Sequence, residues 1–289
     1  MKLFKLKTTI RRYFARIFQL HRPASYPYLS GDGFRAIANF IYDQFLDFDP
    51  TLVMRGDIIF VRNNCLHEFF IKIHPLIKES YVLVSNNEDA TIGSDFTKHI
   101  DEKIIHWYSQ NLLFRHPKVT VLPIGIQNFT VGHDENFIHA FSKINIDPKK
   151  QNRILYGFTH NDTVPERVLV HSVLSKLKNS DYVNLPRSEY YKKLNTYKFI
   201  ASPRGGGLDC HRTWEALYFK VIPIILRSIF SEQLVELGFP ILLIDNWADV
   251  EKFSEEFLTD YYEKNKDKFD TPKLYLPCWY KKFSGDKLK

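Results

Sequence analysis

The segment KFIASPRGGGLDCHRTWEALYFKVIPIIL, residues 198–226, combines strand, loop and helix patterns in quick succession. Its first part, KFIASP, and its last part, VIPIIL, are short apolar runs of the kind that form buried strands. Between them, three glycines precede CHRTWEALYF, which predicts a helix over 210–219. Because strands that alternate with helices form a parallel sheet covered by helices, this segment predicts an α/β fold.

The same alternation extends over the rest of the chain. Strands are predicted at 56–62, 80–87, 119–125, 154–158 and 241–245. Helices are predicted at 34–47, 66–77, 103–113, 165–177, 188–197, 230–238 and 249–258. A basic, polar stretch at 142–153 divides the pattern in two and is the best candidate for a linker. The sequence therefore predicts two α/β domains whose strand ends face each other across a cleft.

These limits place the two domains at 23–148 and 149–270, followed by a tail at 271–289 that packs back on the first domain. Ahead of them, residues 1–22 predict a basic amphipathic helix, with apolar residues at helical spacing and no acidic residue. Such a helix can dock on an anionic membrane surface. It can equally pack on the protein with its charges in water, and the sequence leaves both readings open.

Lys and Arg outnumber Asp and Glu by 40 to 33, and the net charge of +7 favours an anionic partner such as a nucleotide or an acidic membrane surface. No recognition-helix pattern, zinc-finger spacing or aromatic RNA-binding motif is present, so we expect no nucleic-acid partner and no structural metal. Three widely spaced cysteines fit a reducing compartment. With no long apolar run and no secretory signal, we expect a cytoplasmic protein, peripheral at the inner face of a membrane if the first helix docks there.

The glycines between the predicted strand and helix are a candidate phosphate-binding loop, formed by Gly205, Gly206 and Gly207. A strand, a glycine loop and a helix aim the N–H groups of the helix at an anion, and glycine lets the backbone come close to it. Arg204 and Arg212 can add charge-assisted hydrogen bonds to phosphate oxygens. The spacing matches neither a Walker A loop nor the G-x-G-x-x-G dinucleotide fingerprint, which argues against a nicotinamide-dependent oxidoreductase.

The helix after the glycines carries further polar residues. Asp209 is expected to be its N-cap, with the carboxylate accepting from the first turn. Glu215 lies on the same face as Arg212, so it can accept hydrogen bonds from ribose or sugar hydroxyls, or pair with that arginine. Trp214 lies off this face and is expected in the core.

Taken whole, SPRGGGLDCHRTWEALYFKVIPII resembles the exostosin-type glycosyltransferases, family 47 and its bacterial and viral relatives. Their second domain carries S-P-x-G-x-G-x-D-x-x-R-x-x-E-A, followed by a short segment and I-P-I/V. The matching positions are Ser202, Pro203, Gly205, Gly207, Asp209, Arg212, Glu215 and Ala216. Lys220 stands where the family has Gly before its I-P strand.

The resemblance covers about residues 80–255. WYSQNLLFRHPKVTVLPIGIQN at 107–128 is similar to the family's W-F-A-Q-N…H-P-K…P-I-G-I/L-E-N segment, with Gln127 in place of the acidic residue. Similar segments also occur at 83–92, 155–170 and 241–250.

The resemblance implies a GT-B fold, in which two Rossmann-like domains face each other. The N-terminal domain would bind the acceptor, a glycan or a lipid-linked sugar, and the C-terminal domain the nucleotide-sugar donor, a UDP- or GDP-sugar. It also implies inversion at the sugar carbon with no metal or other cofactor. Arg167, Arg204 and Arg212 would then stabilise the departing diphosphate, and Glu215 would bind ribose.

An inverting transfer needs a general base, and the sequence offers several candidates. Asp89, at a strand end in the first half, is the first, and His133 and Glu88 follow. Asn161 and Thr163, on the loop after the strand at 154–158, could line the sugar pocket. The sequence leaves two functions open. One is a glycosyltransferase, and the other is a catalytically silent protein that binds a nucleotide sugar or a glycan.

Overall fold

A computed structural model describes residues 25–128, 145–146, 149–158 and 164–285. The predicted helix at 1–22, three of the candidate site residues (His133, Asn161 and Thr163) and the last residues of the predicted tail lie outside this part of the chain.

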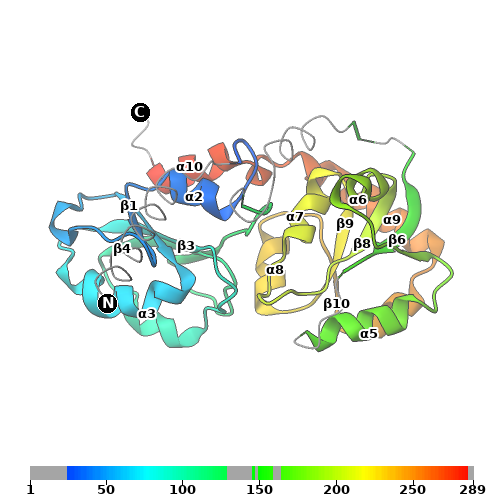
Figure 1. Ribbon diagram of the computed structural model, residues 1–289, viewed down its shortest axis with the longest axis horizontal. Helices are drawn as coiled ribbons and strands as arrows, with labels where there is room; N and C mark the ends of the chain where they lie inside the picture. The colour runs from blue at the N-terminus through cyan, green and yellow to red at the C-terminus, as the bar shows by residue number, and fades with distance from the viewer. Residues whose placement is uncertain (1–24, 129–144, 147–148, 159–163, 286–289) are drawn as a thin grey trace, which may run out of the picture.

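The described chain contains two parallel five-stranded sheets, seen side by side in Figure 1. The N-terminal sheet has the order β1-β2-β3-β4-β5, with strands Phe40–Tyr42, Ile58–Arg62, Tyr81–Asn86, Ile104–Ser109 and Val119–Val121. The C-terminal sheet has the order β10-β9-β8-β6-β7, with β6 at Gln151–Tyr156, β7 at Ser180–Tyr182, β8 at Tyr197–Ala201, β9 at Ile222–Leu226 and β10 at Leu242–Ile244. The α/β class and the parallel pairing are therefore confirmed.

The order of the C-terminal sheet changes direction at β6. From β6 the chain passes to β7 on one side, then returns to β8 on the other side and continues outward to β9 and β10. The loops after β6 and β8 consequently leave the same edge of the sheet in opposite directions. Such a switch point opens a crevice at the carboxyl ends of the strands, where ligands of open α/β sheets bind.

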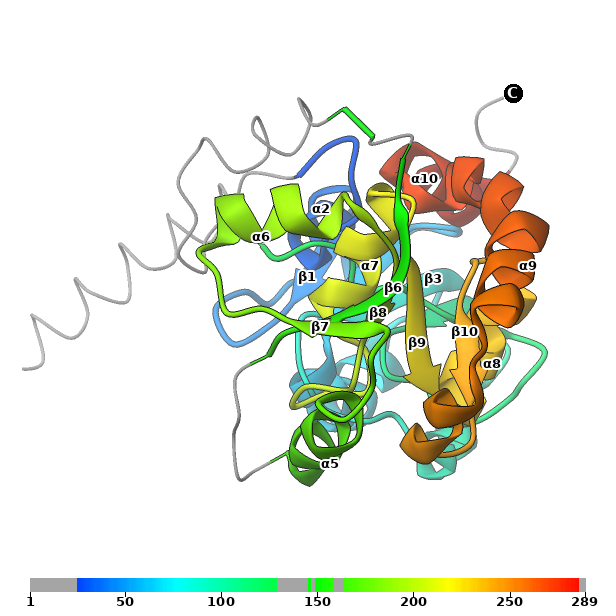
Figure 2. The same ribbon diagram turned by 90° about the vertical axis from the view of Figure 1, so that its right-hand side faces the viewer.

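Helices cover both sheets, as Figures 1 and 2 show. Around the N-terminal sheet they are α2 (Gly31–Ala36), α3 (Leu66–Glu68, continued by a π-turn at Phe69–Ile73), and 3₁₀ helices at Pro50–Leu52, Asn63–Cys65, His74–Leu76 and Ser94–His99. Around the C-terminal sheet they are α5 (Pro165–Leu174), α6 (Arg187–Leu194), α7 (His211–Tyr218), α8 (Ile229–Glu236), α9 (Glu255–Asn265) and 3₁₀ helices at Trp247–Lys252, Lys266–Asp270 and Pro272–Leu274. The last helix, α10 (Leu276–Ser284), lies beside α2 over the N-terminal sheet.

Aromatic side chains hold α10 in that position. Trp279 is fully buried, and its ring lies edge-on to Phe34 at 6.2 Å and to Tyr108 at 6.1 Å between centroids. Phe283 adds a contact with Tyr108 at 4.6 Å. Edge-to-face aromatic pairs of this kind contribute about 0.5–1.5 kcal/mol beyond the burial of area. The last described helix therefore packs on the N-terminal sheet, which the first described strands form.

Two of the predicted helices are wrong. Residues 34–47 form only the end of α2, and Phe40–Tyr42 then pairs with β2 as an edge strand. Residues 103–113 contain the interior strand β4, whose backbone pairs with β3 on one side and β5 on the other. Their apolar spacing suits a helix, but β-branched and aromatic residues fit a half-buried strand equally well. The hydrogen bonds to β3 and β5 determine that the segment is a strand.

Smaller differences concern element ends. The short polar edge strand β7 was not predicted, and β6 begins inside the stretch assigned to the linker. The helix predicted at 249–258 is in fact two helices, a 3₁₀ helix at Trp247–Lys252 and then α9. The side chain of Ser254 accepts from the N–H of Phe257 and caps this second helix. A new cap inside an apolar pattern starts a new helix.

The turn between α7 and β9 places Lys220 in a backbone conformation that glycine favours. The N–H of Val221 donates to Ala216 O and the N–H of Lys220 donates to Leu217 O, which is a Schellman end to the helix. Lys220 adopts a φ of 54°, in the left-handed region that glycine occupies without strain. Its ammonium pairs with Asp270 at 2.8 Å on the surface.

Replacing this lysine should therefore separate backbone strain from the ion pair. We expect Lys220→Gly to be more stable than Lys220→Ala by about 1 kcal/mol, because only glycine removes the Cβ from a left-handed position. Both variants lose the exposed ion pair, so their difference reports the backbone alone. Urea unfolding of the two variants gives the answer, and a glycine variant less stable than the alanine variant would contradict it.

Candidate functional site

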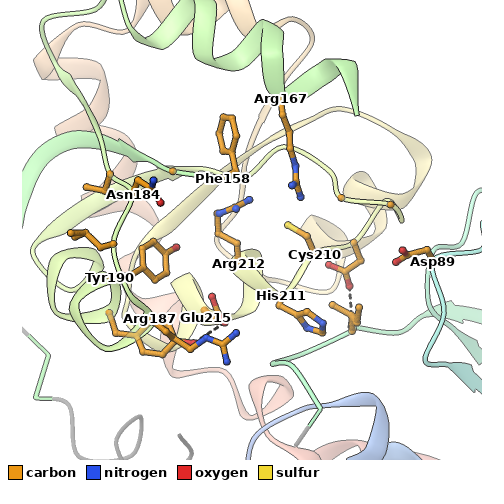
Figure 3. A pocket seen from close by; sticks show the side chains of 18 residues that line it. Asp89, Phe158, Arg167, Asn184, Arg187, Tyr190, Cys210, His211, Arg212 and Glu215 are labelled. Atoms are coloured by element: carbon orange, nitrogen blue, oxygen red, sulfur yellow. Dashed lines mark hydrogen bonds between the residues drawn. The ribbon is translucent and has the colours of Figure 1, made fainter. Parts of the chain in front are cut away.

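A cavity of about 520 Å³ opens at the switch point of the C-terminal sheet. Its walls come from the loops after β6, β7 and β8, from the N-terminal parts of α5, α6 and α7, and from two residues of the N-terminal half of the chain, Asp89 and Ile124 (Figure 3). Of the predicted site residues, those that line it are Asp89, Arg167, Gly205, Gly206, Asp209, Arg212 and Glu215. The fold thus brings together side chains that lie far apart in the sequence, from Asp89 to Glu215.

The glycine loop is packed against the N-terminal half. A Cβ at Gly206 would overlap the carboxylate of Asp89, and a Cβ at Gly207 would come within 2.7 Å of the amide nitrogen of Asn111. At Gly205 the nearest group is Arg167 Nη2, at 3.4 Å. The first requirement for glycine here is therefore close approach between the two halves, and only Gly205 and Gly206 also face the cavity.

Asp209 joins the halves beneath the loop. Its Oδ2 accepts from the backbone N–H of Ile124 at 2.7 Å, and its Oδ1 accepts from Trp214 Nε1 at 2.8 Å. Its own N–H donates to Asn111 Oδ1 at 2.9 Å. The predicted N-cap role is wrong, since Cys210 is the N-cap of α7 and makes no side-chain capping bond. Burial raises the pKa of Asp209 to about 7, although the donated hydrogen bonds oppose the rise.

Arginines supply positive charge to the cavity. Arg212 lies with its guanidinium carbon 5.5 Å from the centre of the Phe158 ring, and its Nη1 is buried without a hydrogen-bond partner in the described part of the chain. Arg167 points toward it (Figure 3), and its Nε donates to the carbonyl of Arg204 at 3.1 Å. Burial, and then the charge of Arg212, lower the pKa of Arg167. Two like charges close together in a cavity repel each other, so their arrangement favours the binding of an anion.

The other end of the cavity carries a carboxylate and two tyrosines. Glu215 Oε1 accepts from the hydroxyl of Tyr191 at 2.8 Å. Within the described chain it forms no ion pair with Arg212, so that alternative is not what the structure contains. The Tyr190 hydroxyl is buried and, among the described residues, lacks a hydrogen-bond partner, and burial raises its pKa. Trp214 is fully buried in the core, as predicted.

Three of the predicted and described residues, Gly207, Glu88 and Arg204, do not line the cavity. Glu88 pairs with Arg62 at 2.7 Å, on the N-terminal side. Arg204 is exposed, and the part of it that reaches the site is its carbonyl, which holds Arg167.

The sequence interpretation missed several residues of the site. The most prominent are His211, whose Nδ1 lies 2.8 Å from the carbonyl of Gly125, and Arg187, which donates to Gln127 Oε1 at 2.8 Å. His211 stands inside the quoted motif and could have been noticed there. Arg187 follows Pro186 at the start of a helix, and nothing in its own neighbourhood indicates the cavity.

No group of three or more His, Cys, Asp or Glu side chains in the described residues could hold a metal ion. Among the same residues, no helix is long and apolar enough to cross a membrane.

The sequence matches no protein-family model and no curated protein. Several solved structures are similar in part. The apo structure of OtsA has a TM-score of 0.43 and 12% identity, over 78% of this chain and 72% of that one. TarM has a TM-score of 0.43 and 14% identity, over 80% and 55%. An alpha,alpha-trehalose-phosphate synthase (UDP-forming) from Burkholderia vietnamiensis has a TM-score of 0.42 and 11% identity, over 82% and 70%.

The carboxyl of Asp209 should make stability depend on pH. Its pKa is about 7 in the folded chain, against a usual value of 3.8. At a solution pH between these two values, folding is therefore accompanied by the uptake of a proton. The stability it contributes is present at low pH and is lost as the pH rises toward 7. Relative to Asp209→Asn, the wild-type free energy of unfolding should fall by about 3 kcal/mol between about pH 5 and about pH 8.

Urea unfolding of both proteins at the two pH values measures this difference. The exposed Asp245, replaced by Asn in the same way, is the control and should show no comparable change. A constant difference between wild type and Asp209→Asn would mean that the buried carboxyl stays ionised throughout.

Proposed function

We propose that this chain is a glycosyltransferase that moves a sugar from a nucleotide-sugar donor to a glycan or glycolipid acceptor. The observation that carries the proposal is the pair Arg167 and Arg212, held together in a cavity at the carboxyl ends of parallel strands. A buried guanidinium nitrogen without a partner is unfavourable unless a ligand completes it. An anionic ligand does so, and a diphosphate has oxygens for both arginines.

The loop and helix beside the arginines support a diphosphate in particular. The N-terminal end of α7 lines the cavity with His211 and Arg212, and Gly205 and Gly206 bring no side chain into it. The N-terminus of a helix favours a bound anion. Phe158 presents its ring to Arg212 and helps to hold the guanidinium in place. In a reaction without a metal, these groups would stabilise the negative charge of the leaving nucleoside diphosphate.

The remaining lining residues suit the rest of a nucleotide sugar. Glu215 has one carboxylate oxygen bonded to Tyr191, and its other oxygen can accept from a ribose hydroxyl. A UDP- or GDP-sugar is the donor that we propose. The acceptor would enter from the side of Asp89 and Ile124, which belong to the N-terminal half. The enzyme that we propose is of the GT-B type and inverts the configuration at the transferred carbon.

A catalytically silent protein that binds a nucleotide sugar is the second candidate. The same arginines would bind the diphosphate without any transfer, so binding alone does not separate the two functions. Release of nucleoside diphosphate from a mixture of nucleotide sugars does, because only an enzyme breaks the bond between sugar and phosphate.

Removal of Arg212 tests the diphosphate site. A charge-assisted hydrogen bond contributes about 1.5–3 kcal/mol, so Arg212→Ala should weaken the binding of UDP or GDP by about 10- to 150-fold. Isothermal titration calorimetry with each nucleotide measures the dissociation constants. The melting temperature should rise with the nucleotide that binds wild type and rise less with the variant.

Arg227→Ala is the matched control. Arg227 is a half-exposed arginine on the same sheet that pairs with Asp245 at 2.7 Å and does not line the cavity. The substitution Arg227→Ala removes the same charge as Arg212→Ala, and it should leave nucleotide binding unchanged. Equal losses in the two variants would indicate a general effect of charge and contradict a specific diphosphate site.

A further inference from the structure

His211 is the first residue of α7, and its ring has a defined orientation in the cavity. Its Nδ1 lies 2.8 Å from the carbonyl oxygen of Gly125, in the N-terminal half. A carbonyl oxygen can only accept, so Nδ1 must carry a proton and donate it. This bond fixes both the angle of the ring and its tautomer.

The ring is held in its neutral form. Burial lowers the pKa of His211, and the charge of Arg187 on α6 acts in the same direction. The Gly125 carbonyl and the carboxylates of Glu215 on α7 and Asp89 after β3 oppose the shift and are outweighed. The N-terminus of a helix further disfavours a positive charge. With the proton on Nδ1, Nε2 therefore carries a lone pair.

That lone pair is available to a ligand. Among the described residues none forms a hydrogen bond with Nε2, and the ring lines the same cavity as Arg167 and Arg212 (Figure 3). A group that accepts a proton thus stands beside groups that can take up the negative charge of a leaving phosphate. This is the juxtaposition that a substitution at a sugar carbon requires.

We infer that His211 is the general base of the proposed transfer, a role that rests on the proposed function. The hydroxyl of the acceptor gives its proton to Nε2, and the electron pair of its oxygen forms the new bond to the anomeric carbon. The bond from that carbon to the phosphate oxygen breaks, and its electron pair leaves with the nucleoside diphosphate, beside Arg167 and Arg212. Water in place of the acceptor gives hydrolysis by the same route.

The carboxylates considered from the sequence are less well placed. Glu88 forms its ion pair with Arg62 and does not line the cavity. Asp89 does line it, but its carboxylate packs against Gly206 on the loop assigned to the diphosphate. A carboxylate packed against that loop would be close to the leaving phosphate, where its charge opposes the negative charge that develops.

His211→Asn is the variant that separates a base from a structural role. The asparagine amide can place an N–H where Nδ1 stands, so the bond to Gly125 can be kept while Nε2 is lost. His211→Gln is the second variant, which puts an amide without useful proton affinity near the Nε2 position. Exposed His67→Asn, outside the cavity, is the control.

The measurement is release of nucleoside diphosphate from UDP- and GDP-sugars, with water or added glycans as acceptors, together with calorimetric binding of UDP and GDP. We expect both His211 variants to bind the nucleotide as wild type does and to lose about 10²- to 10⁴-fold in kcat. The wild-type kcat/KM should fall at low pH with a pKa below that of an ordinary histidine, and this acidic limb should be absent from both variants. Asp209 also titrates in the cavity, so the limb must disappear with His211 to be assigned to it.

The outcomes separate the two proposals. If wild type binds UDP or GDP but releases none from any sugar donor, transfer itself is contradicted and the base role with it. If wild type releases nucleotide and the His211 variants keep either the rate or the acidic limb, His211 is not the base and the proposed transfer stands. If Asp89→Asn removes the limb while His211→Asn keeps it, the base is Asp89.

Discussion

The site depends on the contact between residues 209–211 and the N-terminal half. The carboxylate of Asp209 accepts the N–H of Ile124, its N–H donates to Asn111, and the next ring along, His211, donates to Gly125. These bonds fix the start of α7 against the loops after β4 and β5. Without them the glycine loop and the arginines would face open solvent, and the cavity would lack its second wall.

This contact explains why the glycines are needed. Asp89 and Asn111 come so close to Gly206 and Gly207 that a side chain at either position would displace them. Asn111 itself adopts a φ of 53°, a left-handed conformation that asparagine tolerates better than most residues. Strain and close packing are thus concentrated where the two halves meet. That is the usual place for them in a protein whose ligand site lies between packed elements.

The electrostatics of the cavity are uneven. At one end Arg167 and Arg212 lie close together, and the Nη1 atom of Arg212 has no partner in the described part of the chain. At the other end Glu215 is already bonded to Tyr191. A long ligand with a doubly negative centre and hydroxyl groups on one side matches this separation of the arginines from the carboxylate. The neutral ring of His211 lies in the same cavity and adds no positive charge to it.

The sequence by itself determined the parallel α/β class, the strand–glycine–helix unit of the C-terminal half and the cationic character of the site, because each of these follows from local composition and spacing. Only the tertiary structure decided that β4 is a strand, since its hydrogen bonds come from β3 and β5. It also decided that Asp209 joins the two halves instead of capping α7, and that His211 is oriented by Gly125. In each case the partner lies far away along the chain, and a hydrogen bond to a distant backbone group leaves no trace in the pattern of neighbouring residues.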